Sequence, residues 1–461
     1  MCAYATPDDV LFRLFCTLAS SYQILAMAKM ARSIPLVAAV LLGLVSAQTP
    51  DGTPEVHPKI TTWQCTKKGG CVKQTNKIVL DSLYHPIYQE NAPEYDCGVW
   101  GETPNATACP DIESCQAECK QRGISDYSEF GIQTDGDALL LEQLGEDGSL
   151  LTPRVYLLKE DGQEYEMLKL TGGEFSFDVD VSKLPCGMNG ALYLSEMAAD
   201  GGKSELNKGG AYHGTGYCDA QCYTTPFING EPNLEGYGSC CNEMDIWEAN
   251  ARSNTFVPHP CNVSGLVECE GEACEWGGIC DKWGCGWNPY QLGNTDYYGQ
   301  SSDFTVDTTR PFTVVSQFPA DENGKLLQYR RFYIQDGKKI PQAEYNLEEH
   351  ADELGGTNWI DDNFCEVRNS ERYNDLGAAG AMGGAMARGM VLALSIWWDA
   401  GGNMTWLDGA TAGSGPCRDG EGNPTFIEEV QPDTAVIFSK IKWGELDSTY
   451  KLGCKSRARK A

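Results

Sequence analysis

Long apolar runs are missing from the sequence beyond residue 47, where no segment approaches the roughly 20 consecutive apolar residues that a transmembrane helix needs. Basic residues are also scarce, since 35 Lys and Arg stand against 65 Asp and Glu and give a formal net charge of -30. This charge disfavours nucleic acids and anionic membrane surfaces as partners. A neutral or cationic ligand is more compatible with it.

Repeats, low-complexity tracts and linkers rich in Pro, Ser and Thr are absent from residues 48–450, which favours a single domain there. With 41% hydrophobic residues in the chain, such a domain can bury a large core. The Cys-x2-Cys spacing of zinc sites is absent from the same residues. We therefore expect neither a metal site nor a cofactor.

Residues 1–47 have the features of a leader. Arg32 precedes the apolar run at 36–45, which ends on small residues before Gln48, and this is the order of a secretory signal peptide. Met30 is a natural start for that signal, so the signal proper is expected at about residues 30–47, preceded by an upstream extension or an unusually long leader. The product is expected to be secreted and soluble.

The number of cysteines agrees with secretion. Of 21 cysteines, Cys2 and Cys16 lie in the leader and Cys454 lies in a basic C-terminal tail, residues 451–461. The even number that remains allows nine disulfides, which are typical of proteins that fold in an oxidising compartment. Candidate N-glycosylation sites are Asn105, Asn262 and Asn403.

Strand signals dominate the chain. Residues 174–181 alternate between apolar and polar side chains, the pattern of a half-buried strand, and residues 390–398 are nearly all apolar, as in a strand buried on both faces. Further β-rich runs lie at 165–170, 191–197, 312–318 and 332–334. Asp-Gly or Asn-Gly turn signals at 135–136, 161–162, 189–190 and 336–337 each separate two such runs. The pattern predicts an all-β fold, a large antiparallel β-sandwich.

Residues 238–250 place three carboxylates within six residues, directly after a Cys-Cys pair. Alternation with apolar residues puts Glu243 and Asp245 on one face of a strand. Glu248 lies three residues after Asp245 and would therefore point to the opposite face of a regular strand. A β-bulge adds one residue and would return Glu248 to the face that carries Glu243 and Asp245. The alternative is a solvated acidic strand edge, which the interleaved Met, Ile and Trp argue against.

Two Glu residues that flank one bond, with an Asp between them, are what glycoside hydrolysis requires. In a retaining reaction the two carboxyl groups lie about 5–5.5 Å apart. Fully extended backbone would separate the Cα atoms of Glu243 and Glu248 by about 16 Å. Strand curvature, a bulge and inward-leaning side chains must therefore bring them together.

Over about residues 48–450 the sequence closely resembles glycoside hydrolase family 7, the secreted fungal cellulases that include endoglucanases and cellobiohydrolases. The resemblance is carried by residues 238–250 and by further blocks at 184–193, 214–222, 395–399 and 403–408. It implies a concave antiparallel β-jelly-roll sandwich whose long loops form an open substrate cleft. It also implies one catalytic domain, which hydrolyses β-1,4-glucan with retention of configuration.

The resemblance assigns roles to individual residues. Glu243 resembles the nucleophile, Glu248 the general acid/base and Asp245 the residue that positions the nucleophile, while His259 matches a histidine near the acid/base. Positions that match sugar-contacting residues are Asn189, Tyr193, Tyr217, Asp219, Gln221, Trp397 and Trp406. Taken alone, most of these side chains would be ordinary strand-face or core residues, and the face of Trp398 is open.

The resemblance also implies how the cysteines pair. The implied disulfides are Cys65–Cys71, Cys97–Cys119, Cys109–Cys115, Cys186–Cys417, Cys218–Cys241, Cys222–Cys240, Cys261–Cys280, Cys269–Cys274 and Cys285–Cys365. Two of them would fasten the chain just before the acidic strand to its neighbouring segment.

Loop lengths separate the two branches of the family. The segments 231–238 and 275–279 are shorter than those that form a tunnel in cellobiohydrolases, and Tyr84 and Gln291 replace a tryptophan and an arginine of that branch. We therefore expect a monomeric endo-β-1,4-glucanase that acts on β-1,4-glucan polysaccharide. The alternatives are a cellobiohydrolase and a noncatalytic glycan-binding β-sandwich, and the presence of both Glu243 and Glu248 argues against the second.

Overall fold

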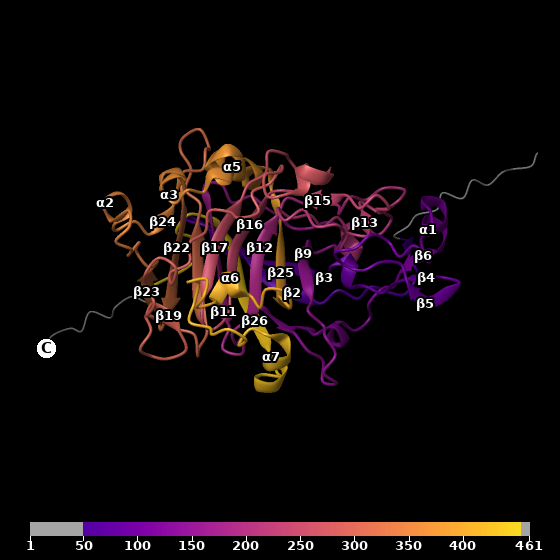
Figure 1. Cartoon of the computed structure of the whole chain (residues 1–461), viewed down its shortest axis with the longest axis horizontal. Coiled ribbons are helices and arrows are strands. Elements are labelled where there is room, and N and C mark those ends of the chain that lie inside the picture. Colours follow the sequence, from indigo (N-terminus) through magenta and orange to yellow (C-terminus); the bar gives the residue numbers. More distant parts are fainter. Residues whose placement is uncertain (1–48, 453–461) are drawn as a thin grey trace, which may run out of the picture. The chain divides into compact units, whose positions relative to one another are not determined.

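Strands dominate the structure, as the alternating patterns predicted (Figure 1). The computed structural model describes residues 49–452, so the expected signal peptide, Cys2, Cys16 and Cys454 lie outside the described residues. The largest sheet has 16 strands and is antiparallel except where β2 meets β26. No helix among the described residues is long and apolar enough to cross a membrane.

The large sheet consists of two halves that meet at the β2–β26 pair. The first half runs in the order β17 (Asn254–His259), β16 (Glu243–Ala249), β12 (Met188–Ser195), β25 (Met390–Trp398), β9 (Arg154–Leu158), β3 (Gly70–Leu80) and β2 (Lys59–Thr66). The second continues with β26 (Ala435–Glu445), β11 (Gly173–Asp180), β21 (Phe312–Gln317), β22 (Tyr329–Gln335) and β23 (Lys338–Pro341). Shorter strands attach to these: β10 (Met167–Leu168), β24 (Trp359–Ile360), β8 (Ala138–Glu142) and β7 (Ile132–Asp135).

The two halves face each other across the hydrophobic core. Trp247 of β16 is fully buried, and its ring centroid lies 5.9–6.3 Å from those of Phe177, Phe312 and Tyr333 on β11, β21 and β22. Aromatic contacts at such distances add stabilisation of about 0.5–1.5 kcal/mol each beyond area burial. The fold is therefore a β-sandwich with the acidic strand β16 in one layer, as predicted.

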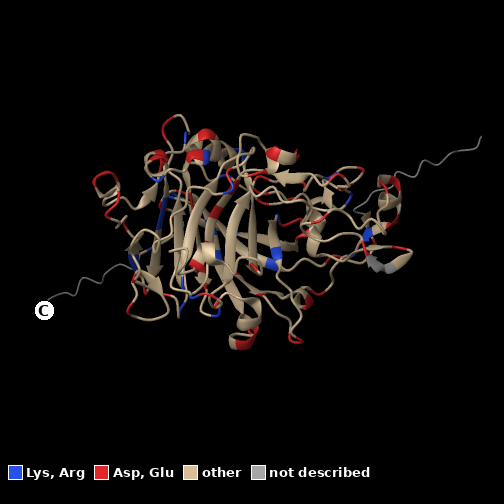
Figure 2. Cartoon of the chain, viewed as in Figure 1, with Lys and Arg blue, Asp and Glu red and all other residues tan. Residues whose placement is uncertain are grey.

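The remaining elements are short. Small sheets are formed by β1 (Thr49–Pro50), β4 (Ile87–Gln89), β5 (Ala92–Asp96) and β6 (Cys119–Gln121), and by the pairs β13 (Phe227–Ile228) with β14 (Glu231–Pro232), β15 (Gly238–Cys240) with β18 (Val267–Cys269), and β19 (Tyr298–Gly299) with β20 (Val306–Asp307). The α-helices are α1 (Ile112–Glu118), α2 (Ala351–Leu354), α3 (Asp362–Val367), α4 (Glu371–Asp375), α5 (Ala378–Arg388), α6 (Thr405–Asp408) and α7 (Pro424–Val430). Single 3-10 turns lie at Ser82–Tyr84, Tyr127–Phe130, Gly210–His213 and Gly271–Cys274. Figure 2 shows that the acidic excess is carried mainly by loops and short helices.

One predicted turn is wrong. Asn189-Gly190 lies inside β12, where it pairs with both β16 and β25, and does not connect two strands. Gly190 is required by close packing, because a Cβ there would lie 2.8 Å from Leu184 and 3.0 Å from Val436. Pairing on both sides thus overrides the turn preference of Asn-Gly. The signals at 135–136, 161–162 and 336–337 do form turns, and of the predicted strand at 165–170 only β10 forms.

Candidate active site

The three carboxylates of β16 share one face of the sheet. In an antiparallel pair, residues directly opposite each other lie on the same face. Glu243, Asp245 and Glu248 stand opposite His259, Val257 and Thr255, which are alternate residues of β17 and therefore point the same way. Glu243 and Glu248 also stand opposite Ser195 and Ala191, alternate residues of β12. The pairing with β17 and the pairing with β12 therefore place the carboxylates on the same face of the sheet.

A β-bulge brings Glu248 onto that face, as the parity break predicted. Between Asp245 and Glu248 the register with β17 shifts, and a matching shift occurs on the β12 side, so β16 contains one residue more than either neighbour. The apolar residues Met244, Ile246 and Trp247 meanwhile remain in the core. The bulge therefore separates acid from apolar side chains despite the irregular spacing.

The bulge is held from the core side by Arg331 of β22. Its guanidinium donates a hydrogen bond from Nη2 to the Ile246 carbonyl and one from Nη1 to Asn254 Oδ1 at 3.2 Å. Arg331 is buried, forms no ion pair with a described carboxylate and lies 5.2 Å from the Trp247 ring centroid, so burial lowers its pKa. Arg331 is not among the residues that the sequence predicts for the site, although alternation in β22 places it on the same face as the buried Tyr333.

Glu248 is held by Asn189. Asn189 Nδ2 donates to Glu248 Oε1 at 2.9 Å, while its Oδ1 accepts from the Ala249 backbone N–H at 3.1 Å, so the second bond fixes which way the amide points. Burial, followed by the nearby charge of Asp245, raises the pKa of Glu248 to about 8. Asn189 is fully buried, so its role is to orient Glu248, and its predicted contact with sugar has no exposed surface to support it.

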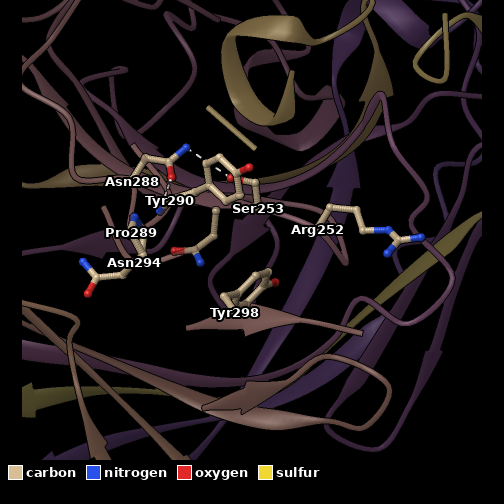
Figure 3. A pocket seen from close by; sticks show the side chains of 8 residues that line it. Arg252, Ser253, Asn288, Pro289, Tyr290, Asn294 and Tyr298 are labelled. Atoms are coloured by element: carbon tan, nitrogen blue, oxygen red, sulfur yellow. Dashed lines mark hydrogen bonds between the residues drawn. The ribbon is translucent and has the colours of Figure 1, made fainter. Parts of the chain in front are cut away.

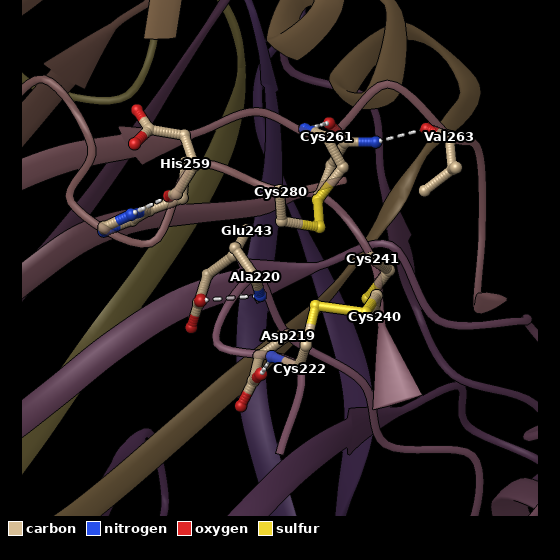
Figure 4. The surroundings of a disulfide bond; sticks show 12 residues. Asp219, Ala220, Cys222, Cys240, Cys241, Glu243, His259, Cys261, Val263 and Cys280 are labelled. Carbon is tan, nitrogen blue, oxygen red and sulfur yellow. Dashed lines mark hydrogen bonds between the residues drawn. A yellow bond between two sulfur atoms is a disulfide. The ribbon is translucent and has the colours of Figure 1, made fainter. Parts of the chain in front are cut away.

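Glu243 is held by the backbone of a neighbouring segment. Its Oε2 accepts from the Ala220 N–H at 3.1 Å (Figure 4). Cys218–Cys241 and Cys222–Cys240 flank Ala220 on both sides and fasten it to the chain just before β16. Burial, and then the charges of Asp245 and Asp219, raise the pKa of Glu243 well above its usual value. The full set of nine disulfides implied by the resemblance is present in the structure.

Asp245 and His259 lie against each other beside Glu243. His259 Nε2 lies 3.0 Å from Asp245 Oδ2, and both side chains are buried. His259 Nδ1 lies 2.8 Å from the Asp281 carbonyl, which only accepts, so Nδ1 carries a hydrogen. Burial, and then the charge of Asp219, raise the pKa of Asp245 well above its usual value, which favours its protonated form.

Tyr193, Tyr217 and Asp219 form a buried chain beside Glu243. The Tyr193 hydroxyl lies 3.1 Å from that of Tyr217, which donates to Asp219 Oδ2 at 2.9 Å. The Arg154 guanidinium lies 3.5 Å from the Tyr217 ring centroid and forms an ion pair at 2.6 Å with the buried Asp81. The three predicted sugar-contacting residues are thus mostly occupied with one another.

Two predicted tryptophans lie beside the carboxylates. Trp397 of β25 stands opposite Asn189, on the same face as Glu248, and its ring centroid lies 6.4 Å from that of Trp406. Trp406 is 41% exposed. Trp398, whose orientation the sequence left open, packs against the core instead. Trp397 and Trp406 therefore offer aromatic surface near Glu248.

Two cavities lie elsewhere and contain none of the predicted catalytic or sugar-contacting residues. One of about 10 Å³ is lined by Arg252, Ser253, Asn288 and Tyr298 among others (Figure 3), and this is room for about one water molecule. The other, of about 350 Å³, is lined by Asp96, residues 98–99 and residues 102–106, among them the glycosylation candidate Asn105. Three clusters of potential metal ligands contain cysteines, but their sulfur atoms are in disulfides and cannot serve as thiolate ligands.

Comparisons with known proteins agree with this geometry. Residues 49–450 match the family described as Glycosyl hydrolase family 7. The chain is 55% identical to endoglucanase EG-1 of Humicola insolens over 91% of this chain and 96% of that protein. It is also 55% identical to endoglucanase 1 of Pyricularia oryzae, over 92% of this chain and 100% of that protein.

Solved structures resemble the chain over most of its length. The native endocellulase EGI of Humicola insolens superposes with a TM-score of 0.84 at 55% identity, covering 87% of this chain and 100% of that one. An endoglucanase I complexed with cellobiose gives a TM-score of 0.84 at 52% identity over the same shares. A family 7 cellobiohydrolase from Daphnia pulex gives 0.80 at 35% identity, again over 87% and 100%.

Proposed function

The chain belongs to glycosyl hydrolase family 7, and from that premise we propose that Glu243 and Glu248 are the nucleophile and the acid/base of an endo-β-1,4-glucanase that retains configuration. The observation that carries this proposal is the common face of the two carboxylates across the bulge in β16. A bare acidic strand edge would need neither the bulge nor a separate hydrogen bond to each carboxyl group.

The reaction proceeds in two steps. Glu243 attacks the anomeric carbon while Glu248 donates its proton to the glycosidic oxygen, so the glycosidic bond breaks and a glycosyl ester forms on Glu243. In the second step Glu248, now ionised, takes a proton from water, which attacks the anomeric carbon and releases Glu243. Two inversions at one carbon restore the original configuration.

The two residues need opposite protonation states. A pKa of about 8 keeps Glu248 protonated in neutral and acidic solution, as an acid must be. Glu243 must be ionised to attack. Burial works against this ionisation, and the Ala220 N–H bond and the nearby His259 act in the opposite direction by lowering the pKa of Glu243. Asp245 and His259 thus position and tune the nucleophile.

Short loops favour attack within a glucan chain over threading from its end. Residues 231–238 fold back through the β13–β14 hairpin, where Asn233 bonds to both Thr225 and Tyr237. The segment after Cys274 is closed by its disulfide to Cys269 and by Cys261–Cys280. These segments are too short to roof a tunnel, and the greater identity to endoglucanases than to the cellobiohydrolase agrees. The substrate is therefore an internal stretch of β-1,4-glucan.

Several further properties belong to this proposal. Residues 48–450 act as one catalytic domain, and the protein works as a monomer outside the cell. Nine disulfides support folding in an oxidising compartment. Of the glycosylation candidates, Asn105 and Asn262 are exposed and Asn403 is half-buried, so the first two are more accessible to modification.

The mode of attack is tested by measuring viscosity loss and reducing-end release in parallel on carboxymethyl cellulose. An endoglucanase lowers viscosity early, at low yield of reducing ends. A variant with a longer loop between Gly230 and Ser239 should lower viscosity more slowly. Cellobiose as nearly the sole early product from crystalline cellulose, with little loss of viscosity, would instead identify a cellobiohydrolase.

A further inference from the structure

Two tryptophans that the proposed reaction does not use are exposed side by side. Trp283 is 73% exposed and Trp276 49% exposed, and their ring centroids are 4.4 Å apart at an interplanar angle of 31°. Each indole therefore covers part of the other and leaves its remaining surface to solvent. Exposed apolar surface of this kind marks interaction sites, since single surface residues rarely pair in this way.

The segment that carries Trp283 borders the carboxylate face. The backbone N–H groups of Asp281, Cys285 and Trp287 donate to the carbonyls of Pro260, Pro258 and Phe256 at 2.9, 3.3 and 2.9 Å, so residues 281–287 lie along the free edge of β17 and of the residue that follows it. A Cβ at Gly284 would lie 2.7 Å from the His259 ring, so this contact leaves no room for a side chain. Trp283 is thus the chain neighbour of Gly284, which packs against the His259 ring.

A second contact ties the segment to the site. Gln221, from the chain next to Ala220, donates from Nε2 to the Lys282 carbonyl at 3.0 Å. The segment is also fixed covalently, by Cys261–Cys280 just before it and by Cys285–Cys365 within it. The backbone that carries the tryptophans is therefore conformationally restrained, which reduces the entropy that is lost when a ligand binds.

We propose that Trp276 and Trp283 form a second glucan-binding surface, on the side of β16 opposite to Trp397. This inference rests on the proposed function. In the sheet β16 has β12 and then β25, with Trp397, on one side, and β17 and then residues 281–287 on the other. Trp397 and Trp283 are thus each about two strand spacings, roughly 10 Å, from the carboxylate strand. A glucan that crosses the strands would meet both pairs.

The chemistry of the surface suits a neutral sugar chain. The C–H faces of β-linked glucose units are apolar and stack on aromatic rings, while their hydroxyl groups point sideways. Lys282 Nζ lies 5.8 Å from the Trp276 ring centroid and supplies a hydrogen-bond donor at its edge. The occupant is accordingly the same β-1,4-glucan that the carboxylates cleave, extended beyond the sugars next to the scissile bond.

The test compares short and long ligands. In a Glu243→Gln background, calorimetry would measure binding of cellobiose and cellohexaose to the parent and to the double variant Trp276→Ala/Trp283→Ala. We expect the double variant to bind cellohexaose about fivefold to tenfold more weakly and cellobiose unchanged, from the usual strength of aromatic stacking. In the catalytic chain, the same pair should leave kcat/KM on an aryl cellobioside within about twofold while lowering it on long oligosaccharides.

Trp63→Ala is the matched control. Trp63 lies on β2, and its ring centroid is 5.6 Å from Lys442 Nζ. In the sheet, β12, β25, β9 and β3 separate β2 from β16. Cellohexaose binding no weaker in the double variant than in the control would overturn the inference, as would equal weakening for cellobiose and cellohexaose. If the double variant does not fold, Trp276→Phe/Trp283→Phe takes its place, with an expected partial loss confined to cellohexaose.

A contact between two copies of the chain is the other possible use of this surface. Sedimentation that depends on protein concentration in the parent and not in the double variant would identify that use and overturn the glucan assignment. Failure of the proposed function is seen separately. It would appear as unchanged hydrolysis in Glu243→Gln, whatever the tryptophan variants do.

Discussion

Arg331 donates a hydrogen bond to the carbonyl of Ile246, within the bulge that turns Glu248 onto the same face as Glu243. A bulge interrupts the ladder and leaves backbone groups without a strand partner. The buried guanidinium supplies a donor at that point, from the opposite layer of the sandwich. The geometry of the acid/base thus depends on a residue that never faces the substrate.

Replacing Arg331 should therefore affect turnover more than binding. Arg331→Met keeps the apolar contacts and removes the donor, so Glu248 shifts relative to the scissile bond, and kcat should fall by about tenfold to a hundredfold with little change in KM. Leaving the Ile246 carbonyl unpaired should also cost about 1–3 kcal/mol of folding stability. Arg330→Met, on the exposed side of the same strand, is the control. A loss of stability with unchanged kcat would reduce Arg331 to a purely structural role.

Glu243→Gln should abolish turnover and preserve oligosaccharide binding, because it removes the attacking carboxylate at nearly constant shape. A 2-fluoro glycoside should label the unmodified chain on Glu243, which peptide mass spectrometry would locate. Glu268→Gln, an exposed carboxylate on β18, is the control and should remain active. Labelling at another carboxylate would contradict the assignment.

Glu248→Ala should lose activity on substrates with poor leaving groups and keep the first step on aryl glycosides whose leaving groups need no protonation. Added azide, which attacks without a general base, should restore the second step and yield a glycosyl azide. The rates of both substrates with and without azide provide the measurement. Equal losses and no rescue would show that Glu248 is not the acid/base.

The alkaline limb of kcat/KM should lie near pH 8, where Glu248 loses the proton it must donate. Asn189 donates to the carboxylate and thereby favours the ionised form, so Asn189→Ala should move that limb to higher pH. A pH profile of the variant on a soluble cello-oligosaccharide measures the shift. A lower rate with an unmoved limb would mean that Asn189 only supports the fold.

Acid should destabilise the fold through His57, which is half-buried, and His213, which is buried. Burial lowers the pKa of His57 to about 4 and that of His213 to about 3. The unfolded chain, with a histidine pKa near 6.5, therefore binds more protons, and stability falls as pH drops from about 6.5 towards those values. His213→Gln should reduce this fall by an amount of order 3 kcal/mol, seen as a smaller difference in unfolding free energy between pH 7 and pH 4. An unchanged difference would refute the role of His213.

The sequence predicted β16 well because its constraints are local. Parity alone indicated that Glu248 needs one extra residue, and the register shifts on both sides of β16 confirm it. The resemblance supplied the cysteine pairs, which join residues as far apart as Cys186 and Cys417 and which no spacing rule would have given.

What the sequence did not predict depends on contacts between distant segments. Asn189-Gly190 has the composition of a turn, and only its position between two other strands makes it part of β12. Arg331 was missed because a charged residue in a strand normally faces solvent. Trp276 and Trp283 gave no periodic signal, since they lie in a loop whose course follows from its disulfides and its bonds to β17.

The bulge also makes β16 two half-strands in opposite phase. Up to Asp245 the odd-numbered residues face the substrate side, and from Glu248 the even-numbered ones do. If the same residues formed a regular strand without the bulge, either the nucleophile or the acid/base would turn into the core. Deleting Ile246 or Trp247 would instead leave the acids in one continuous phase and remove an apolar side chain from the core. Catalysis here therefore depends on the backbone irregularity between Asp245 and Glu248 as well as on the identity of the carboxylates.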